Sequence, residues 1–149
     1  MTAASRPEIT VAVRRGACRL MRQAGHSVLL EGPLPDGRRA DILAVGRGGE
    51  IVIVEVKSSV DDFRVDTKWP DYLDWCDQLY FAVPLDFPQA LIEGPVGLIV
   101  ADAYGAERLR EAPRKALAAA RRKSLLIDCA RLAGERLARL DDPDFAGFL

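Results

Sequence analysis

Two apolar runs separated by a short glycine-rich segment constrain the fold of this chain more than any other feature. Residues 41–45 and 51–55 consist mainly of β-favouring apolar residues, and the five residues between them include three glycines, which suit a hairpin loop. If the last residue of the first run pairs with the first residue of the second, Asp41 lies directly opposite Glu55. The sequence therefore predicts an antiparallel hairpin that brings two carboxylates together.

The opposed carboxylates predict a metal site. Directly opposed residues have Cβ atoms roughly 4.5 to 5.5 Å apart, and two negative charges at that separation repel unless a cation lies between them. Magnesium prefers a few carboxylate oxygens and keeps several bound waters, and manganese accepts similar ligands. We therefore expect Asp41 and Glu55 to bind Mg²⁺, with Mn²⁺ as a substitute and with the carbonyl of Val56 as a further ligand.

Lys57 adds a positive charge to the same site. It lies two residues beyond Glu55, so it projects from the same face of the strand, about 6.6 Å further along. We expect it to approach a bound phosphate, where it positions or helps to deprotonate the attacking water, or neutralises developing charge. Taken alone, the common tripeptide Glu-x-Lys would favour an ordinary solvent-facing strand end. The strand pattern and the opposed Asp41 favour the site.

A longer string of residues extends this motif. It comprises Arg38-Arg39-Ala40-Asp41-Ile42, Glu55-Val56-Lys57-Ser58-Ser59, Asp66-Thr67-Lys68-Trp69, Tyr72, Cys76-Asp77 and Tyr80-Phe81-Ala82-Val83. The string resembles the PD-(D/E)XK nuclease signature and, within that superfamily, the MmcB-like DNA repair proteins. The similarity continues through residues 97–102 and the arginine-rich C-terminal segment, so it covers most of the chain. Ala40 stands where the name of the motif has proline, and that proline carries no chemistry.

The resemblance implies an α/β fold with a restriction-endonuclease-like core, a mixed sheet of element order αβββαβ flanked by helices, and a C-terminal helical segment. The residue pattern agrees, because a capping box at Ser5 begins an amphipathic helix, and a crossover helix after Pro70 would make the fourth strand parallel to the third. The expected elements are a helix over 5–25, strands over 28–31, 41–45 and 51–55, a helix over 71–77, strands over 79–83 and 96–101, two or three helices within 107–140, one of them opened by Pro113, and an acidic tail over 141–144.

The length of the chain and its scarce histidine limit the remaining choices. The 149 residues, 49% of them apolar, suit a single domain spanning residues 1–149. His26 is the one histidine and has no nucleophile pattern near it, so the chain either uses carboxylates, lysine and metal for catalysis or has no catalytic chemistry. The three cysteines suit neither a disulfide framework nor a zinc cluster, and no run approaches the roughly 20 apolar residues of a membrane span. We expect a cytoplasmic protein with no membrane partner.

Further charged residues extend the predicted site. The resemblance implies an acidic residue upstream of Asp41, and Glu31 is assigned this catalytic role, with a solvated strand end as an equal alternative. Whether Glu8 of the capping box also joins the site stays open. The net charge of −1 means that DNA must bind to a localised patch. The residues expected to contact nucleic acid are Lys68, Arg121, Arg122 and Lys123, although a basic run on a helix is often only a solvated face.

Two functions remain after this reading. The first is a metal-dependent deoxyribonuclease, a hydrolase that cleaves DNA phosphodiester bonds in DNA repair, with DNA and other repair proteins as partners. The second is a noncatalytic accessory module that retains the nuclease fold and binds nucleic acid or protein. The paired carboxylates favour the first function, because a binding module does not need them. The sequence leaves open endonuclease or exonuclease activity, DNA or RNA as substrate, and the oligomeric state, with a homodimer among the options.

Overall fold

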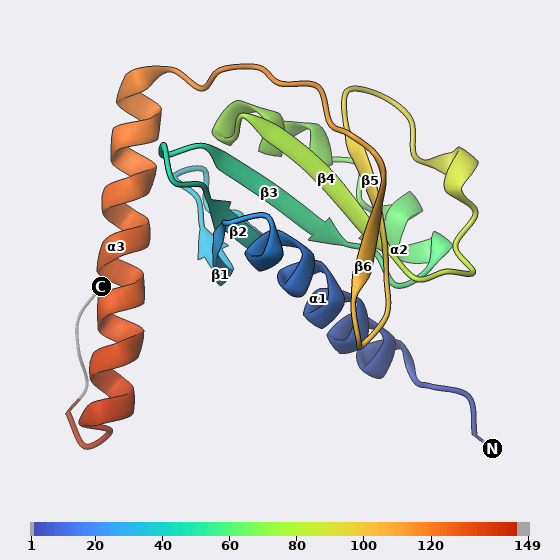
Figure 1. Cartoon of the computed structure of the whole chain (residues 1–149), viewed down its shortest axis with the longest axis horizontal. Coiled ribbons are helices and arrows are strands. Elements are labelled where there is room, and N and C mark those ends of the chain that lie inside the picture. Colours follow the sequence, from blue (N-terminus) through green and yellow to red (C-terminus); the bar gives the residue numbers. More distant parts are fainter. Residues whose placement is uncertain (1, 146–149) are drawn as a thin grey trace. The chain divides into compact units, whose positions relative to one another are not determined.

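A six-stranded mixed sheet forms the centre of the first part of the chain (Figure 1). The computed structural model describes residues 2–145, and the chain divides into two compact units, Met1–Leu117 and Ala118–Leu149, which we describe separately. The strands lie in the order β1-β2-β3-β4-β5-β6. Their bounds are β1 Ser27–Pro33, β2 Arg39–Val45, β3 Ile51–Val56, β4 Gln78–Val83, β5 Gly97–Ala101 and β6 Ala106–Arg110. The predicted α/β class, a mixed sheet flanked by helices with a C-terminal helical segment, is confirmed.

Helical segments precede, connect and follow the strands. In the first unit they are α1 Arg6–Gln23, α2 Val60–Val65 and the 3₁₀ helices η1 Trp69–Trp75 and η2 Gln89–Leu91, and the second unit contains α3 Ala119–Asp141. Among residues 2–145, no helix is long and apolar enough to cross a membrane.

The predicted hairpin is present in the predicted register. β2 and β3 are antiparallel, and Val45 pairs with Ile51. In the loop between them, the amide of Gly49 donates to the carbonyl of Gly46 at 3.0 Å. Gly49 has a φ of 89°, a left-handed value that glycine adopts without steric cost. β1 is longer than predicted at both ends, and it pairs antiparallel with β2.

The connection from β3 to β4 contains one helix more than predicted. β3 and β4 are parallel, as predicted, but the helix expected over 71–77 is a 3₁₀ helix that begins at Trp69. The polar stretch before it contains the six-residue α2, which buries no side chain completely and so lacks the apolar period of a recognisable helix. Phe63 of α2 and Trp69 of η1 pack edge-on against Phe81 of β4, with ring centroids 5.5 and 5.3 Å apart. These aromatic contacts fix the crossover to the sheet.

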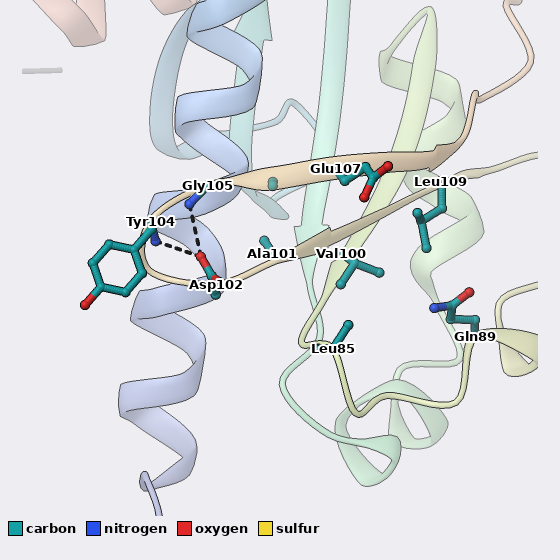
Figure 2. Close-up of a pocket in the computed structure, with 10 residues that line it drawn as sticks. Leu85, Gln89, Val100, Ala101, Asp102, Tyr104, Gly105, Glu107 and Leu109 are labelled. Carbon is teal, nitrogen blue, oxygen red and sulfur yellow. Dashed lines mark hydrogen bonds between the residues drawn. The ribbon is translucent and has the colours of Figure 1, made fainter.

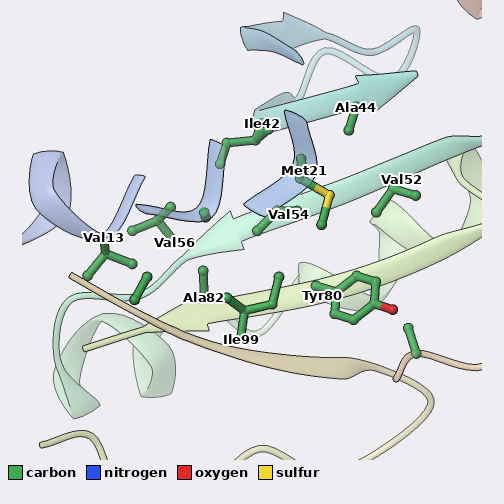
Figure 3. Close-up of a cluster of buried hydrophobic side chains, with 13 residues drawn as sticks. Val13, Met21, Ile42, Ala44, Val52, Val54, Val56, Tyr80, Ala82 and Ile99 are labelled. Carbon is green, nitrogen blue, oxygen red and sulfur yellow. The ribbon is translucent and has the colours of Figure 1, made fainter. Parts of the chain in front are cut away.

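Helix α1 packs against one face of the sheet and closes the main hydrophobic core (Figure 3). The helix begins at the predicted capping box, where the amide of Ser5 donates to Glu8 Oε2 at 2.6 Å. A Cβ atom on Gly16 would lie 2.1 Å from the carbonyl oxygen of Asp102, so only glycine allows this close approach to the β5–β6 turn. The buried core consists of Val13, Ala17, Met21, Ile42, Ala44, Val52, Val54, Val56, Tyr80, Ala82, Ile99, Ala101 and Ala112.

The segment after β5 corrects the sequence-based prediction. Residues 106–110 form the edge strand β6, antiparallel to β5, where helix was expected from residue 107 onward. Pro113 does not open a helix, because residues 111–118 carry no regular secondary structure. Asp77 holds this segment, since its carbonyl accepts from the amide of Lys115 at 3.0 Å and its Oδ1 accepts from the amide of Leu117 at 2.8 Å. These tertiary hydrogen bonds override the helix propensity of the local sequence.

The second unit contains a single long helix in place of the two or three predicted, as far as its described residues extend. α3 is 23 residues long and runs through Leu140 to Asp141, the first residue of the predicted acidic tail. Leu125 and Leu132 are its buried residues. Arg139 and Glu135 form an ion pair at 3.3 Å, one helical turn apart.

Candidate functional site

Asp41 and Glu55 lie side by side at the end of the hairpin that is farthest from its loop. The amide of Asp41 donates to Glu55 Oε1 at 3.0 Å, and the amide of Val56 donates to Asp41 Oδ2 at 2.7 Å. Glu55 is only 4% exposed, and Asp41 is partly buried. The backbone of β2 and β3 therefore holds both carboxylates in place, as the predicted register required.

Burial perturbs both carboxyl groups, and the negative charge of Asp41 adds to the effect on Glu55. Burial is the main cause that raises the pKa of Glu55 to about 9, and the negative charge of Asp41 is the second cause. Burial also raises the pKa of Asp41, although hydrogen bonds with Val56 and Glu55 and the positive charges of Lys57 and Arg14 act in the opposite direction. At neutral pH the pair therefore retains a proton unless a cation compensates the second negative charge.

Lys57 lies beside the carboxylates and is bound by a residue that the sequence reading missed. Its side chain is nearly buried, and Nζ donates to Asp66 Oδ2 at 2.6 Å. The positive charge of Lys57 also acts to lower the pKa of both Asp41 and Glu55, against the larger effect of burial. Asp66 follows the last residue of α2. No periodic pattern links Asp66 to Lys57 nine residues earlier, so only its place in the family-like string marked it.

Tyr72 and Arg38 are further residues near the site that the sequence did not assign to it. Tyr72 is buried, and its hydroxyl donates to the carbonyl of Arg39 at 3.0 Å. Burial, followed by the negative charges of Glu55, Asp41 and Asp66, raises the pKa of Tyr72, which keeps this hydroxyl a neutral donor. The guanidinium of Arg38 lies 6.0 Å from the centroid of the Tyr72 ring and pairs with Asp71. Arg38 also pairs with Asp36, so two carboxylates compensate its positive charge directly before β2 begins.

Glu31 occupies the position in β1 that is opposite Asp41. The flanking pairs are Leu30 with Ile42 and Gly32 with Ala40. Glu31 is exposed and has a left-handed φ of 51°, which interrupts the regular alternation of the strand. The register thus aligns three acidic residues across β1, β2 and β3, while the catalytic role of Glu31 stays a prediction.

The predicted DNA-binding residues belong to both compact units of the chain. Lys68 is exposed, and its amide donates to Asp66 Oδ1 at 3.3 Å, so it lies close to the Lys57 end of the site. Arg121, Arg122 and Lys123 belong to α3 in the second unit. Because consecutive helical residues point about 100° apart, these three side chains do not share one face of the helix.

The sequence of the chain matches a known family over nearly its whole length. Residues 1–144 match the MmcB-like family of DNA repair proteins. The chain belongs to this family. The match includes the hairpin, Lys57, Asp66 and Lys68, and it confirms the narrower of the two resemblances found in the sequence. The family description indicates a DNA-repair-related role and names no catalytic activity.

This MmcB-like chain is also similar to a solved structure, the SPO1766 protein of unknown function from Silicibacter pomeroyi. The two sequences are 41% identical, and the structures superpose with a TM-score of 0.88 over 94% of this chain and 96% of that chain. Comparison with curated proteins gives no match. The fold is therefore shared with this relative, and the function must be argued from the site.

Away from the carboxylate pair, a hollow lies over β5, β6 and the loop after β4 (Figure 2). Its lining is mostly apolar and includes Leu85, Val100 and Leu109. Of its two acidic residues, Asp102 is engaged in the local turn, because its Oδ1 accepts from the amides of Tyr104 and Gly105 at 2.8 and 3.1 Å. The carboxylate pair of β2 and β3 is the stronger candidate for chemistry.

The donor set of this pair fits a small, hard divalent cation. Carboxylate oxygens are the ligands that Mg²⁺ prefers, and a positive charge between Asp41 and Glu55 would offset the repulsion that raises the pKa of Glu55. Within residues 2–145, no group of three or more His, Cys, Asp and Glu residues is placed to hold a metal ion. A cation here would complete its coordination with a backbone carbonyl and water. Mg²⁺ and the Val56 ligand stay predictions.

Proposed function

We propose that this MmcB-like protein is a metal-dependent deoxyribonuclease of the PD-(D/E)XK superfamily, which hydrolyses DNA phosphodiester bonds in DNA repair. The observation that supports this function most strongly is the arrangement of Asp41, Glu55 and Lys57. Two carboxylates are fixed by backbone amides at 3.0 and 2.7 Å, and a nearly buried lysine lies beside them. A buried acidic pair of this kind destabilises a domain unless it serves a ligand.

Asp41 and Glu55 are the proposed ligands of Mg²⁺ or Mn²⁺, with the Val56 carbonyl as a third. When bound, such a cation stabilises charge on the phosphate and increases the acidity of a coordinated water. The two carboxylates already have fixed positions, because each accepts a backbone amide. Glu31, which is opposite Asp41 in the register, is the proposed additional acidic residue.

Lys57 is the residue proposed to act on the phosphate. Its Nζ donates to Asp66 at 2.6 Å, so Asp66 holds the ammonium group beside the carboxylates. From this position the ammonium neutralises negative charge that develops on the phosphoryl oxygens during attack by water. Asp66 is accordingly a positioning residue. Contact with the phosphate requires Lys57 to share its donors between Asp66 and the substrate, which three N–H bonds permit.

DNA is the proposed partner, together with other repair proteins. Lys68 offers a positive charge near the site, and Arg121, Arg122 and Lys123 are the proposed backbone-contacting residues of α3. Charge reversal at Arg121 and Arg122 should weaken binding to DNA of any sequence and flatten its salt dependence, because phosphate contacts release counterions. Gel-shift titrations from low to moderate salt measure both quantities. Unchanged affinity and slope would move the DNA path to Lys68 and the loop 58–67.

A noncatalytic module is the second candidate, and one observation favours it. The ammonium group of Lys57 is engaged by Asp66 in an ion pair whose side chains are 11% and 23% exposed. If this pair persists in the presence of DNA, Lys57 serves the fold of the crossover segment and not the phosphate. The carboxylate pair would then be a retained feature of the fold.

Cleavage assays distinguish these two functions. Single-stranded, duplex, flap and junction DNA, with matched RNA, should be incubated with the full chain and Mg²⁺ or Mn²⁺. We expect metal-dependent cleavage that Asp41→Asn and Lys57→Ala reduce by roughly 10²- to 10³-fold. The matched controls are Asp86→Asn, at an exposed position, and Lys115→Ala. Cleavage that is equal in the wild type and in both site variants would exclude the nuclease, and DNA binding without cleavage would favour the accessory module.

A further inference from the structure

Helix α3 carries an exposed stripe that is distinct from its buried face. Leu125 and Leu132 are buried, whereas Ile127 and Leu137 are 49% and 66% exposed. The exposed pair belongs to a row of residues spaced 4, 3, 4, 3 and 4 positions apart, which keeps the row within about 80° of the helix circumference. The stripe consists of Lys123, Ile127, Ala130, Gly134, Leu137 and Asp141.

The spacing of the stripe is the same when it is read from either end. Its spacing is symmetric about position 132, with two small residues at the middle, Ala130 and Gly134. Two branched apolar residues, Ile127 and Leu137, flank them, and the two ends carry opposite charges, Lys123 and Asp141. An antiparallel copy of the helix would therefore place small against small, apolar against apolar and positive against negative. A parallel copy would place each charge beside its own kind.

We propose that α3 binds α3 of a second copy of this chain, antiparallel and along this stripe. Each Lys123 then pairs with Asp141 of the second copy, and Ile127 packs against Leu137. This is an isologous contact, in which one self-complementary surface meets itself across a two-fold axis. The contact uses no residue of the carboxylate site, and Lys123 is the one residue that it shares with the proposed DNA-contacting set.

Gly134 gives an independent reason for close approach. A glycine in the interior of a helix destabilises that helix relative to alanine. Within the described part of the chain, and apart from its chain neighbours and the backbone of its own helix, no atom lies within 4 Å of a Cβ atom placed on Gly134, so no other intramolecular contact accounts for the glycine. At the centre of an antiparallel helix pair, Gly134 opposite Ala130 allows the two backbones to approach closely.

The N-terminal half of the stripe is also hollowed. An almost entirely apolar depression there is lined by Ala119, Arg122, Lys123, Leu126, Ile127 and Ala130. In the antiparallel arrangement, Leu137 and Leu140 of the second copy lie over this depression. Leu140 is 81% exposed and would thereby gain an apolar contact. Most of the stability of a helix in a protein comes from packing of its apolar face, so burial of a second face would favour association.

Sedimentation of the full chain, in DNA-free buffer from about 1 to 100 µM, tests the proposal. We expect a monomer–dimer equilibrium in the wild type. Gly134→Leu should raise the dimer Kd by roughly 10- to 100-fold, because added bulk separates the helices. Ser124→Leu, which adds the same side chain outside the stripe, should leave the Kd unchanged. Circular dichroism verifies that each variant is folded.

A charge exchange tests the antiparallel orientation and does not depend on packing. Lys123→Glu and Asp141→Lys should each raise the dimer Kd by roughly tenfold, because two attractive pairs become repulsive. The double variant should restore the wild-type Kd, and Asp128→Lys outside the stripe is the control. A wild type that is monomeric throughout the concentration range overturns the proposal. A dimer that is insensitive to Gly134→Leu, or a double variant without rescue, overturns it as well.

Discussion

The parallel strands β3 and β4 have a buried carboxylate near each end of the pair, and the two carboxylates have different partners. Directly before β4, Asp77 accepts from the amide of Ile51 at 2.7 Å and from the amide of Leu117 at 2.8 Å. At the end of β3, Glu55 accepts from the amide of Asp41 at 3.0 Å and has the carboxyl group of Asp41 as its neighbour. Asp77 is 8% exposed and Glu55 is 4% exposed, so the two carboxylates do not differ in burial. They differ in their neighbours, because backbone amides stabilise the charge of Asp77 whereas a second acid destabilises the charge of Glu55.

The largest expected effect is the loss of stability when the carboxylate of Asp77 is removed. Asp77→Ala should lower the free energy of unfolding by roughly 3 kcal/mol, because two backbone amides lose their buried acceptor. Urea denaturation monitored by circular dichroism measures this loss. Asp86→Ala, an exposed acidic residue in the loop after β4, is the control and should change stability by less than about 0.5 kcal/mol. A loss below about 1 kcal/mol at Asp77 would remove the distinction between the two ends.

The second prediction concerns metal at the opposite end. Mg²⁺ at about 100 times its Kd should stabilise the wild type by about 2.7 kcal/mol, because the cation binds the folded chain and relieves the repulsion between Asp41 and Glu55. Thermal unfolding with and without Mg²⁺ measures the effect, and titration calorimetry gives the Kd. Asp41→Asn should abolish the stabilisation, whereas Asp86→Asn should retain it. An equal response of Asp41→Asn would show that the ion binds elsewhere.

The third prediction is a pH dependence. The pKa of Glu55 is about 9 in the folded chain, above its ordinary value of 4.5, so the folded state binds more protons between these two values. The stability of the metal-free wild type should therefore fall as pH rises through this window. Glu55→Gln should be more stable than the wild type at pH 8 by about 1 kcal/mol or more, and the advantage should vanish near pH 4. Urea denaturation in EDTA tests this, and a pH-independent difference would contradict it.

The smallest expected effect belongs to the ion pair between Lys57 and Asp66. Both side chains retain some exposure, 11% and 23%, so solvent screens their interaction. A double-mutant cycle of Lys57→Ala and Asp66→Asn should give a coupling energy of about 0.5 to 1 kcal/mol that decreases at high salt. A coupling energy above about 3 kcal/mol would mark Lys57 as a structural residue like Asp77 and favour the noncatalytic function.

The hairpin and the crossover could be predicted because their signals are local. The apolar runs of β2 and β3, with three glycines in the loop between them, determine a register in which Asp41 meets Glu55. The parallel pairing of β4 follows from the need for a crossover connection. Lys57 was placed beside the carboxylates for the same reason, since strand periodicity determines on which face a residue lies.

The rest depended on contacts between distant residues. Helix was predicted for β6 because its surroundings are rich in Ala, Leu and Arg, which favour helices. In the fold, pairing with β5 and hydrogen bonds from Arg110 to the carbonyls of Val96 and Ile92 stabilise a strand instead. Asp66 was missed because its contact with Lys57 crosses a non-periodic segment. The hydrogen bonds of Asp77 to Ile51 and Leu117 span 26 and 40 residues, a separation at which sequence pattern has no predictive value.

Local opening of α2 would determine how often the ion pair between Lys57 and Asp66 is broken. α2 lies between Lys57 and Asp66 in the sequence, buries no side chain completely, and contacts Phe81 of the sheet through Phe63. Such a short helix opens at a lower free energy than the strands beneath it. Each opening would carry Asp66 away from Lys57 and release the ammonium group. Hydrogen exchange at the amide of Phe63, which donates to the carbonyl of Ser59 at 3.2 Å, would then record how often the lysine is free to meet a substrate.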